Sequence, residues 1–202
     1  FPKQKNWHSF IMNDELTQFR IKGNPKTLLM YLPGYISSHE GLYHHLNYDN
    51  IAETKLIEMP VTMEFSDGIY MSITEAAIRD YPGMYLMKDD DRFIGKLSPR
   101  IGQEEIKAEI SAFPFATPWR VMTISNCLAT LFETNILTNL NEPCKIEDVS
   151  WIRPYKTTFT WWNGNVVPDT TFSPGNNFQT NKYYIDFAAR NEIDLHSIYG
   201  YA

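Results

Sequence analysis

Thr157-Thr-Phe-Thr-Trp-Trp162 is a run of Thr and aromatic residues, a composition typical of a buried, pleated strand. After a polar loop, residues 176–190 repeat apolar side chains with a helical period, and the Asn pair that opens this segment can cap a helix. Residues 193–199 then indicate a second strand. Strand, helix and strand in this order predict a βαβ unit of a parallel sheet, so a new α/β domain is expected to begin near Asp148.

The preceding residues predict antiparallel β-structure, because short apolar runs alternate with turn residues and no long amphipathic helix interrupts them. Ser66-Asp67-Gly68 lies between two alternating runs and predicts a hairpin. Residues 121–125 and 134–138 predict two further strands, and residues 48–55 a short helix. Antiparallel strands at this spacing favour a sandwich.

A polar link that contains a proline, residues 141–149, separates the two parts. We therefore expect two incomplete domains: a β-sandwich over residues 1–147 and the start of an α/β domain over residues 148–202. The chain begins at Phe1 with neither an initiator Met nor an apolar signal segment, so it is expected to be processed or cut from something longer.

The bulk composition excludes several classes of protein. With 202 residues the chain has room for one large or two small domains. A net charge of −6, with no stripe of Lys and Arg, argues against nucleic acid as a partner. No apolar run is long enough to span a bilayer.

The cysteines and histidines each allow two interpretations. Cys127 and Cys144 fit either one disulfide or two buried thiols, and the thiols are favoured because no disulfide framework is evident. Three histidines around Glu40, at positions 39, 44 and 45, form either a metal cluster or surface histidines, and the missing helical spacing favours the surface. His196 is expected to be a satisfied core residue. The charge run of residues 88–92 is expected to be a solvated loop.

Several ordered motifs, spread over roughly residues 24–202, carry a resemblance to a known family. They are Leu56-Ile-Glu-Met-Pro-Val-Thr-Met-Glu64, Ser72-Ile-Thr-Glu-Ala-Ala-Ile-Arg-Asp-Tyr-Pro-Gly-Met84, Thr117-Pro-Trp-Arg120, Asn139-Leu-Asn-Glu-Pro143, Ser150-Trp-Ile-Arg-Pro154, Trp161-Trp162 and Lys182-Tyr-Tyr-Ile-Asp-Phe-Ala-Ala-Arg-Asn191. These motifs resemble glycoside hydrolase family 97, which hydrolyses α-glucosides or α-galactosides and depends on calcium. The resemblance implies the later part of a β-sandwich followed by the first βαβ unit of a (β/α)₈ TIM barrel.

Glu75 is the candidate metal ligand. It follows a predicted strand, residues 69–73, at the point where the chain leaves the sheet, and such positions face clefts more often than mid-strand positions. The residues alone favour an exposed structural glutamate. In the resembled family, the glutamate of this Glu-Ala-Ala motif binds the catalytic calcium, so the resemblance implies that role for Glu75 and calcium as the cofactor.

Trp161, Trp162 and Asn163 are candidates for substrate binding, since they end the first predicted strand and barrel active sites form at that face. An aromatic ring there stacks on a sugar, or else fills the interface between barrel and sandwich. Neighbouring strand residues point to opposite faces, so we expect one Trp in each role. Asp169, in the following loop, is a further candidate for ligand contact. Residues 199–201 depart from the acidic residue and Gly-Trp found in many family members, so no sugar contact is carried over there.

A glycosidase needs two carboxyl groups beside the scissile bond. In the resembled family these lie on later barrel strands, so no catalytic residue is expected in this chain, and the chain alone is expected to be inactive. The resemblance implies a fragment of an α-glycoside hydrolase that binds α-linked sugars, with a periplasmic or secreted location. The remainder of the enzyme or a second copy is expected to cover the open barrel edge. The alternatives are a non-catalytic carbohydrate-binding module and a structural or interaction protein.

Overall fold

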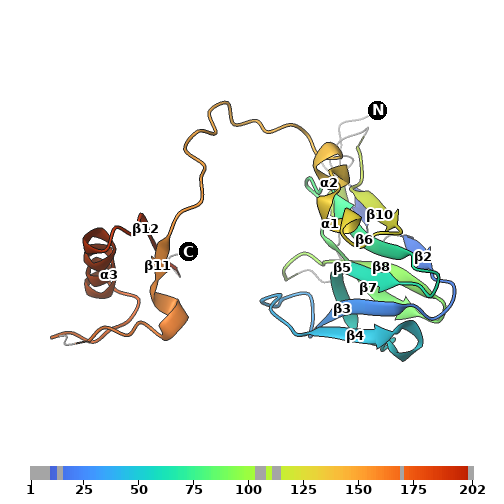
Figure 1. Ribbon diagram of the computed structural model, residues 1–202, viewed down its shortest axis with the longest axis horizontal. Helices are drawn as coiled ribbons and strands as arrows, with labels where there is room; N and C mark the ends of the chain where they lie inside the picture. Colours follow the sequence, from blue (N-terminus) through green and yellow to red (C-terminus); the bar gives the residue numbers. More distant parts are fainter. Residues whose placement is uncertain (1–9, 13–15, 103–107, 111–114, 169–170, 200–202) are drawn as a thin grey trace, which may run out of the picture. The chain divides into compact units, whose positions relative to one another are not determined.

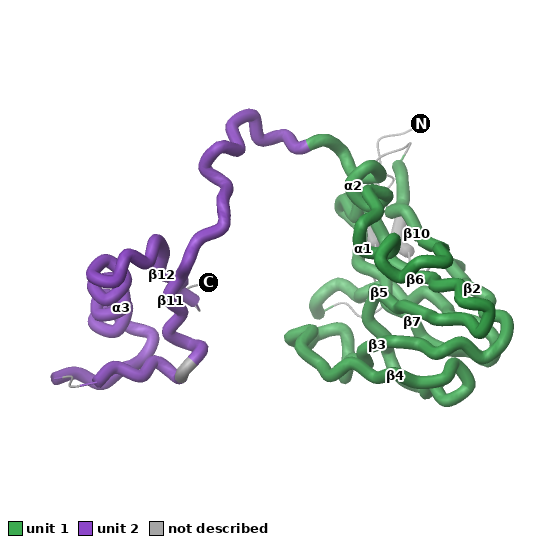
Figure 2. Tube along the Cα trace, in the orientation of Figure 1, with its two compact units in different colours: residues 1–143 green, residues 144–202 purple. Residues whose placement is uncertain are grey.

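The computed structural model describes residues 10–12, 16–102, 108–110, 115–168 and 171–199 (Figure 1). The chain divides into two compact units, Phe1–Pro143 and Cys144–Ala202 (Figure 2). The division falls inside the polar link of residues 141–149, a few residues before the boundary expected from the sequence.

The first unit is built mainly of β-strands, as the sequence predicts. Its strands are β1 (Phe10–Met12), β2 (Gln18–Arg20), β3 (Lys26–Leu32), β4 (Tyr43–Asn47), β5 (Leu56–Glu64), β6 (Tyr70–Ala76), β7 (Met84–Asp89), β8 (Arg92–Leu97), β9 (Ala108–Ile110) and β10 (Trp119–Ser125). Eight of them form one sheet in which β10, β6, β5, β7, β8 and β2 are neighbours in that order, while β3 pairs with both β5 and β4. All these pairings are antiparallel, and β1 with β9 forms a separate antiparallel pair.

The sheet forks at β5. One edge of β5 pairs with β3 from end to end. The other edge pairs first with β7, at Ile57, and then with β6, over residues 61–64. Pro60, which has no N–H to donate, lies in the gap between these two partners. The end of β6 and the start of β7 therefore lie next to each other, and Glu75 occupies this junction.

The core of the first unit lies where the strands turn alternate side chains inward. The strands β6, β7 and β8 alternate buried with half-buried residues, the period-2 pattern of a sheet with one apolar face. The core cluster contains Phe19, Ile21, Leu29, Tyr48, Ile51, Ile57, Val61, Met63, Met71, Ile73, Met84, Leu86, Phe93 and Leu97. Phe93 is its largest fully buried side chain, and its ring packs edge to face on that of Tyr48 with 5.2 Å between centroids.

Three local predictions for this unit are confirmed, including the strand at residues 121–125 within β10, and the strand predicted at residues 134–138 is wrong. The Asp-Gly hairpin joins β5 to β6, and a 3₁₀ turn, η1 (Tyr48–Asn50), lies in the predicted short helix. The strand expected at residues 134–138 is instead helical, with α1 (Thr130–Glu133) and α2 (Ile136–Asn139) following β10 (Figure 1). The hydroxyl of Thr134 accepts from the Ile136 N–H at 3.3 Å, and that of Thr138 donates to the Asn135 carbonyl at 2.9 Å. Such local bonds stabilise turns rather than a strand.

The charge run at residues 88–92 is only in part the solvated loop that we expected: Asp89 and Asp90 are exposed, but Lys88 is buried. It forms the turn of the β7–β8 hairpin, in which Asp90 adopts φ 53°, a conformation that Asp tolerates. Lys88 is buried, with its Nζ 3.2 Å from Glu53 Oε1 and 5.4 Å from the centroid of the Tyr48 ring. The alternation of β7 places Lys88 on the inner face, and its charge remains paired there.

The second unit contains β11 (Thr157–Phe159), a 3₁₀ helix η2 (Thr160–Asn163), α3 (Phe178–Arg190) and β12 (Leu195–Ser197). The two strands pair in parallel, which confirms the predicted strand–helix–strand unit. Asn177 caps α3 by accepting from the Thr180 N–H at 2.9 Å. The first strand is shorter than expected, because the Asn165 N–H bonds to the Thr160 carbonyl at 2.9 Å and closes a helical turn.

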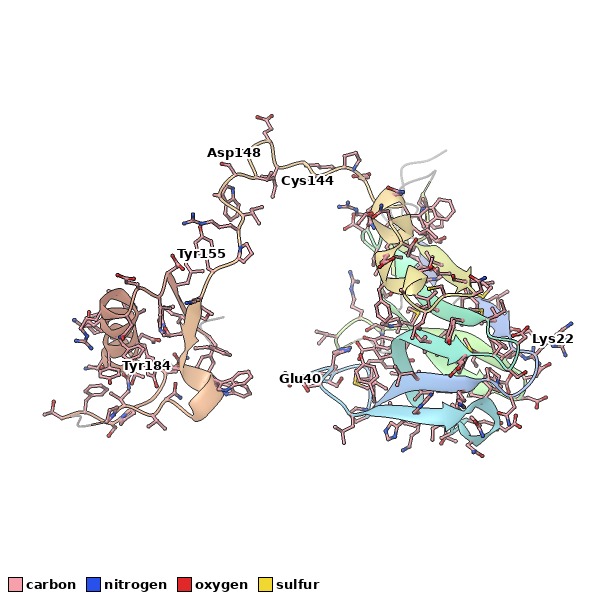
Figure 3. The ribbon with its side chains drawn as sticks, in the orientation of Figure 1. Lys22, Glu40, Cys144, Asp148, Tyr155 and Tyr184 are labelled. Carbon is pink, nitrogen blue, oxygen red and sulfur yellow. The ribbon has the colours of Figure 1, made fainter. Side chains whose placement is uncertain are left out.

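Both cysteines are free and exposed, so the expectation of buried thiols is wrong. Cys144 opens the second unit (Figure 3). In the described part of the chain, no helix has the length and apolar character needed to cross a membrane.

Candidate functional site

Glu75 is held in a fixed position at the fork of the sheet. Its Oε2 forms an ion pair with Arg120 Nη1, which lies directly opposite on β10. The Met84 N–H, at the start of β7, donates to Glu75 Oε1 at 3.0 Å. Arg120 in turn lies over the ring of Tyr81, 5.9 Å from its centroid. The Glu75 carboxylate, which belongs to β6, therefore bonds to a side chain on β10 and to a backbone N–H on β7. These two contacts determine its orientation.

The motifs that are separate in the sequence meet at this position. Glu75, Tyr81 and Met84 belong to one motif, and Arg120 to a second. The third motif, at residues 139–143, joins them through Asn141, whose Oδ1 accepts from the Ala77 N–H at 3.1 Å. Three of the ordered motifs therefore build one local structure around a carboxylate.

The structure corrects the expected setting of Glu75. The residue lies within β6 rather than after the strand, and its side chain is only 11% exposed. The exposure that the residues alone favoured for Glu75 is therefore wrong, whereas its contacts with Arg120 and the Met84 N–H are structural ones. Arg120 is the residue that sequence reasoning left without a role, although cross-strand pairing of opposite charges is a known signal.

The candidate substrate-binding residues gather at the ends of β11 and β12. The rings of Phe159, Trp161 and Tyr199 form a cluster, with centroid separations of 5.7 Å from Phe159 to Tyr199 and 6.2 Å from Trp161 to each of the others. Trp162 is 86% exposed. Asn163 ends η2. Asp169 lies outside the described residues.

The two tryptophans differ in their surroundings, but not for the reason that we expected. They lie in a 3₁₀ helix, so the alternation of a strand does not apply to them. Trp161 packs against Phe159 and Tyr199, and it nevertheless remains 58% exposed. The phenol of Tyr199 is fixed by Asn165, whose Nδ2 donates to it at 2.9 Å. Exposed tryptophan rings therefore lie at this end of the βαβ unit, next to a Tyr199 ring whose position is fixed by Asn165.

His196 links both strands to the helix in the second unit. Its Nδ1 lies 2.8 Å from Thr158 Oγ1 on β11, and its Nε2 lies 2.9 Å from Asn181 Oδ1 on α3. Tyr184, on α3, stacks on the imidazole at 5.9 Å between centroids. Both ring nitrogens have partners, as predicted, although the side chain is half-buried rather than fully enclosed.

We predict that this unit loses stability as the pH falls below neutrality. Burial lowers the pKa of His196 from its ordinary value of 6.5, and the bond with Thr158 opposes that shift only in part. A histidine with a lowered folded pKa favours folding above its unfolded pKa, and this contribution is lost as the pH falls through 6.5 and then through the folded value. Amide protection of α3, corrected for intrinsic exchange, should fall from pH 7.5 to 5. A His196→Gln variant should lack this fall, and an equal fall in both proteins would contradict the prediction.

His39, His44 and His45 are not brought together as a metal site among the described residues. His39 Nδ1 lies 2.6 Å from Glu58 Oε1, while His44 and His45 lie on β4. Among the described residues, no group of three or more His, Cys, Asp or Glu side chains is arranged to hold a metal ion.

These features define a two-part protein in which an antiparallel β unit precedes a parallel strand–helix–strand unit. Comparison with known proteins identifies the family. Residues 1–143 match the glycosyl-hydrolase 97 N-terminal family, and the chain belongs to this family. The resemblance seen in the motifs is thereby confirmed.

Individual relatives agree with this assignment. The chain is 27% identical over 181 residues to a retaining α-galactosidase of Bacteroides thetaiotaomicron, covering 81% of this chain and 27% of that protein. A family 97 glycoside hydrolase from Pseudoalteromonas sp. strain K8, solved in complex with acarbose, matches with a TM-score of 0.74 and 30% identity, over 96% of this chain and 29% of that one. A variant of that enzyme, solved with panose, matches equally well. The chain thus spans less than a third of the length of these relatives.

Proposed function

We propose that this chain is the N-terminal part of a calcium-dependent α-glycoside hydrolase that acts on terminal α-linked glucose or galactose. One observation carries the proposal: residues of three family motifs meet at the fork of the sheet, where two of the motifs contact the Glu75 carboxylate and the third bonds to the nearby Ala77 N–H. The family assignment and the activities named for the relatives support it.

Glu75 suits the role of a calcium ligand. Calcium takes carboxylate oxygens, often from segments distant in sequence. The Glu75 carboxylate is on a paired strand and is oriented by Arg120 and by the Met84 N–H. The described residues do not complete a metal site, so further ligands would come from other parts of the protein. When bound, calcium would supply a positive charge close to the reacting sugar. The role of this chain in calcium binding would be to hold the Glu75 carboxylate in place.

The second unit is proposed to be the first βαβ of a (β/α)₈ barrel. Its parallel strands support this, as do the exposed apolar side chains of Phe159, Leu195 and Ile198 along them. Such side chains need further strands or helices, from the rest of the enzyme or a second copy. Trp161 and Trp162 would then stack on a sugar, with Asn163 and Asp169 as further contacts at the active-site face. A periplasmic or secreted location is proposed from the resemblance alone, and cell fractionation tests it.

We predict that Glu75→Gln in the full-length protein weakens calcium binding about tenfold or more, because one charged oxygen ligand is removed. Isothermal titration with calcium measures the affinity. The rise in unfolding temperature that calcium produces gives a second readout, since a ligand stabilises the state that binds it.

Glu133→Gln removes the same charge at an exposed position on α1, so it serves as the matched control and should leave the affinity unchanged. Unaltered calcium affinity in Glu75→Gln would rule out the metal-binding role. Failure of the full-length protein to hydrolyse aryl α-glucosides and α-galactosides would rule out the proposed activity.

A further inference from the structure

A pocket with a volume of about 730 Å³ lies between the loop that follows β3 and the loop that follows β8. Its chemistry comes from Tyr35, Ile36 and Ser37 in the first loop and from Ser98, Arg100 and Ile101 in the second. Aromatic and aliphatic surface is thus combined with two hydroxyls and a guanidinium. The function proposed above uses none of these residues.

The pocket wall is linked through its backbone to the surroundings of the Glu75 carboxylate. Ser98, in the pocket wall, donates its N–H to the Gly83 carbonyl at 3.0 Å. Gly83 is so close to the carboxylate that a Cβ built on it would lie 3.6 Å from Glu75 Oε1. One backbone hydrogen bond and one residue therefore separate the pocket wall from the proposed calcium ligand, at the end of the sheet where β8 ends and β7 begins.

The aromatic wall of the pocket is held in place by neighbouring side chains. The Tyr35 ring packs edge-on against Tyr85 on β7, with 5.4 Å between centroids. Tyr85 in turn lies 6.0 Å from the ring of His39, which bonds to Glu58. A wall ordered before binding lowers the entropic cost of taking a ligand.

Two aliphatic residues of the pocket are almost fully in solvent. Ile36 is 84% exposed and Ile101 is 86% exposed. A neutral hexose offers an apolar C–H face for such side chains and hydroxyl groups for Ser37, Ser98 and Arg100. This combination of apolar surface with a few polar groups is the usual composition of a small-molecule site.

We propose that this pocket is a subsite of the β domain for the part of an α-linked oligosaccharide that lies beyond the bond to be cleaved. The inference rests on the proposed function and adds to it a determinant of substrate length. The proposal requires that a trisaccharide contacts the pocket and that a monosaccharide with a small leaving group does not.

The test compares substrates of different length in the full-length protein. The variants are Arg100→Met and Ile101→Ala, and the substrates are aryl α-glucoside and aryl α-galactoside against panose and raffinose. Loss of a hydrogen bond from the charged guanidinium of Arg100 should raise the KM for the trisaccharide about tenfold or more, and loss of the apolar contact of Ile101 about fivefold. The KM for the aryl glycoside should stay unchanged, because that substrate makes no contact with the pocket.

Leu42→Ala is the matched control, since Leu42 is 83% exposed and lies in the same stretch between β3 and β4 but not in the pocket wall. It should alter neither KM. The inference is overturned if both pocket variants keep the parental KM for the trisaccharide, or if both substrates change equally. It is also overturned if Ile101→Ala lowers the unfolding temperature relative to Leu42→Ala, because another segment of the protein then covers the pocket. A wild-type protein that hydrolyses neither substrate class contradicts the proposed function itself.

Discussion

Replacing Phe93 by Ala should lower the free energy of unfolding of the first unit by about 3–5 kcal/mol. The ring is fully buried and packs against Tyr48 in the centre of the core cluster. Truncation removes its transfer free energy and leaves a cavity that the paired strands around it cannot fill. A loss of this size is a large part of the stability of an ordinary domain.

Urea denaturation measures this loss as a shift in midpoint with an unchanged slope. Leu16→Ala, at a side chain that is 95% exposed, serves as the control and should change stability by less than about 0.5 kcal/mol. A Phe93→Ala protein as stable as Leu16→Ala would show that the core does not depend on this ring.

The strands of the first unit follow from local pattern, because alternation and turn residues act over a few neighbouring positions. The hairpin at Asp67-Gly68 illustrates this, since the turn and both alternating runs are contiguous. Residues 134–138 have a strand-like composition, yet the hydroxyls of Thr134 and Thr138 bond locally and favour helical turns. Trp161 and Trp162 likewise continue a strand-like run, but backbone bonds from Gly164 and Asn165 close a 3₁₀ turn instead.

The surroundings of the candidate site could not be predicted in the same way. Glu75 was found through its motif, but its partner Arg120 is 45 residues away and its other partner is a backbone N–H on β7. Such contacts depend on which strands become neighbours in the sheet. The alternation of apolar and polar residues along one strand does not predict this. Lys88 shows the converse case: its charge suggested solvent, while its place in the alternation of β7 put it inside.

The chain of residues 1–202, by itself, should show no turnover of aryl α-glucoside or aryl α-galactoside, even with calcium present. Hydrolysis needs two carboxyl groups about 5–10 Å apart on either side of the scissile bond. At the ends of β11 and β12 the described residues offer Thr160, Trp161 and Tyr199, which are not acids of this kind. Glu75, the carboxylate around which the family motifs meet, is paired with Arg120 and is proposed to hold calcium.

The fold of the second unit leads to the same expectation. Two parallel strands cannot close a barrel, and an open strand edge leaves N–H and C=O groups unpaired. Phe159, Leu195 and Ile198 also remain partly exposed, and covering the exposed part of each side chain stabilises a protein by about 1 kcal/mol. The rest of the enzyme would supply both the missing strands and the acid and base. Assays of the short chain and the full-length protein, side by side, measure the difference. If the short chain hydrolyses a substrate and loses this activity when one of its own carboxylates is replaced, the active site lies within residues 1–202. That result would contradict the proposal that the acid and base lie in the rest of the enzyme.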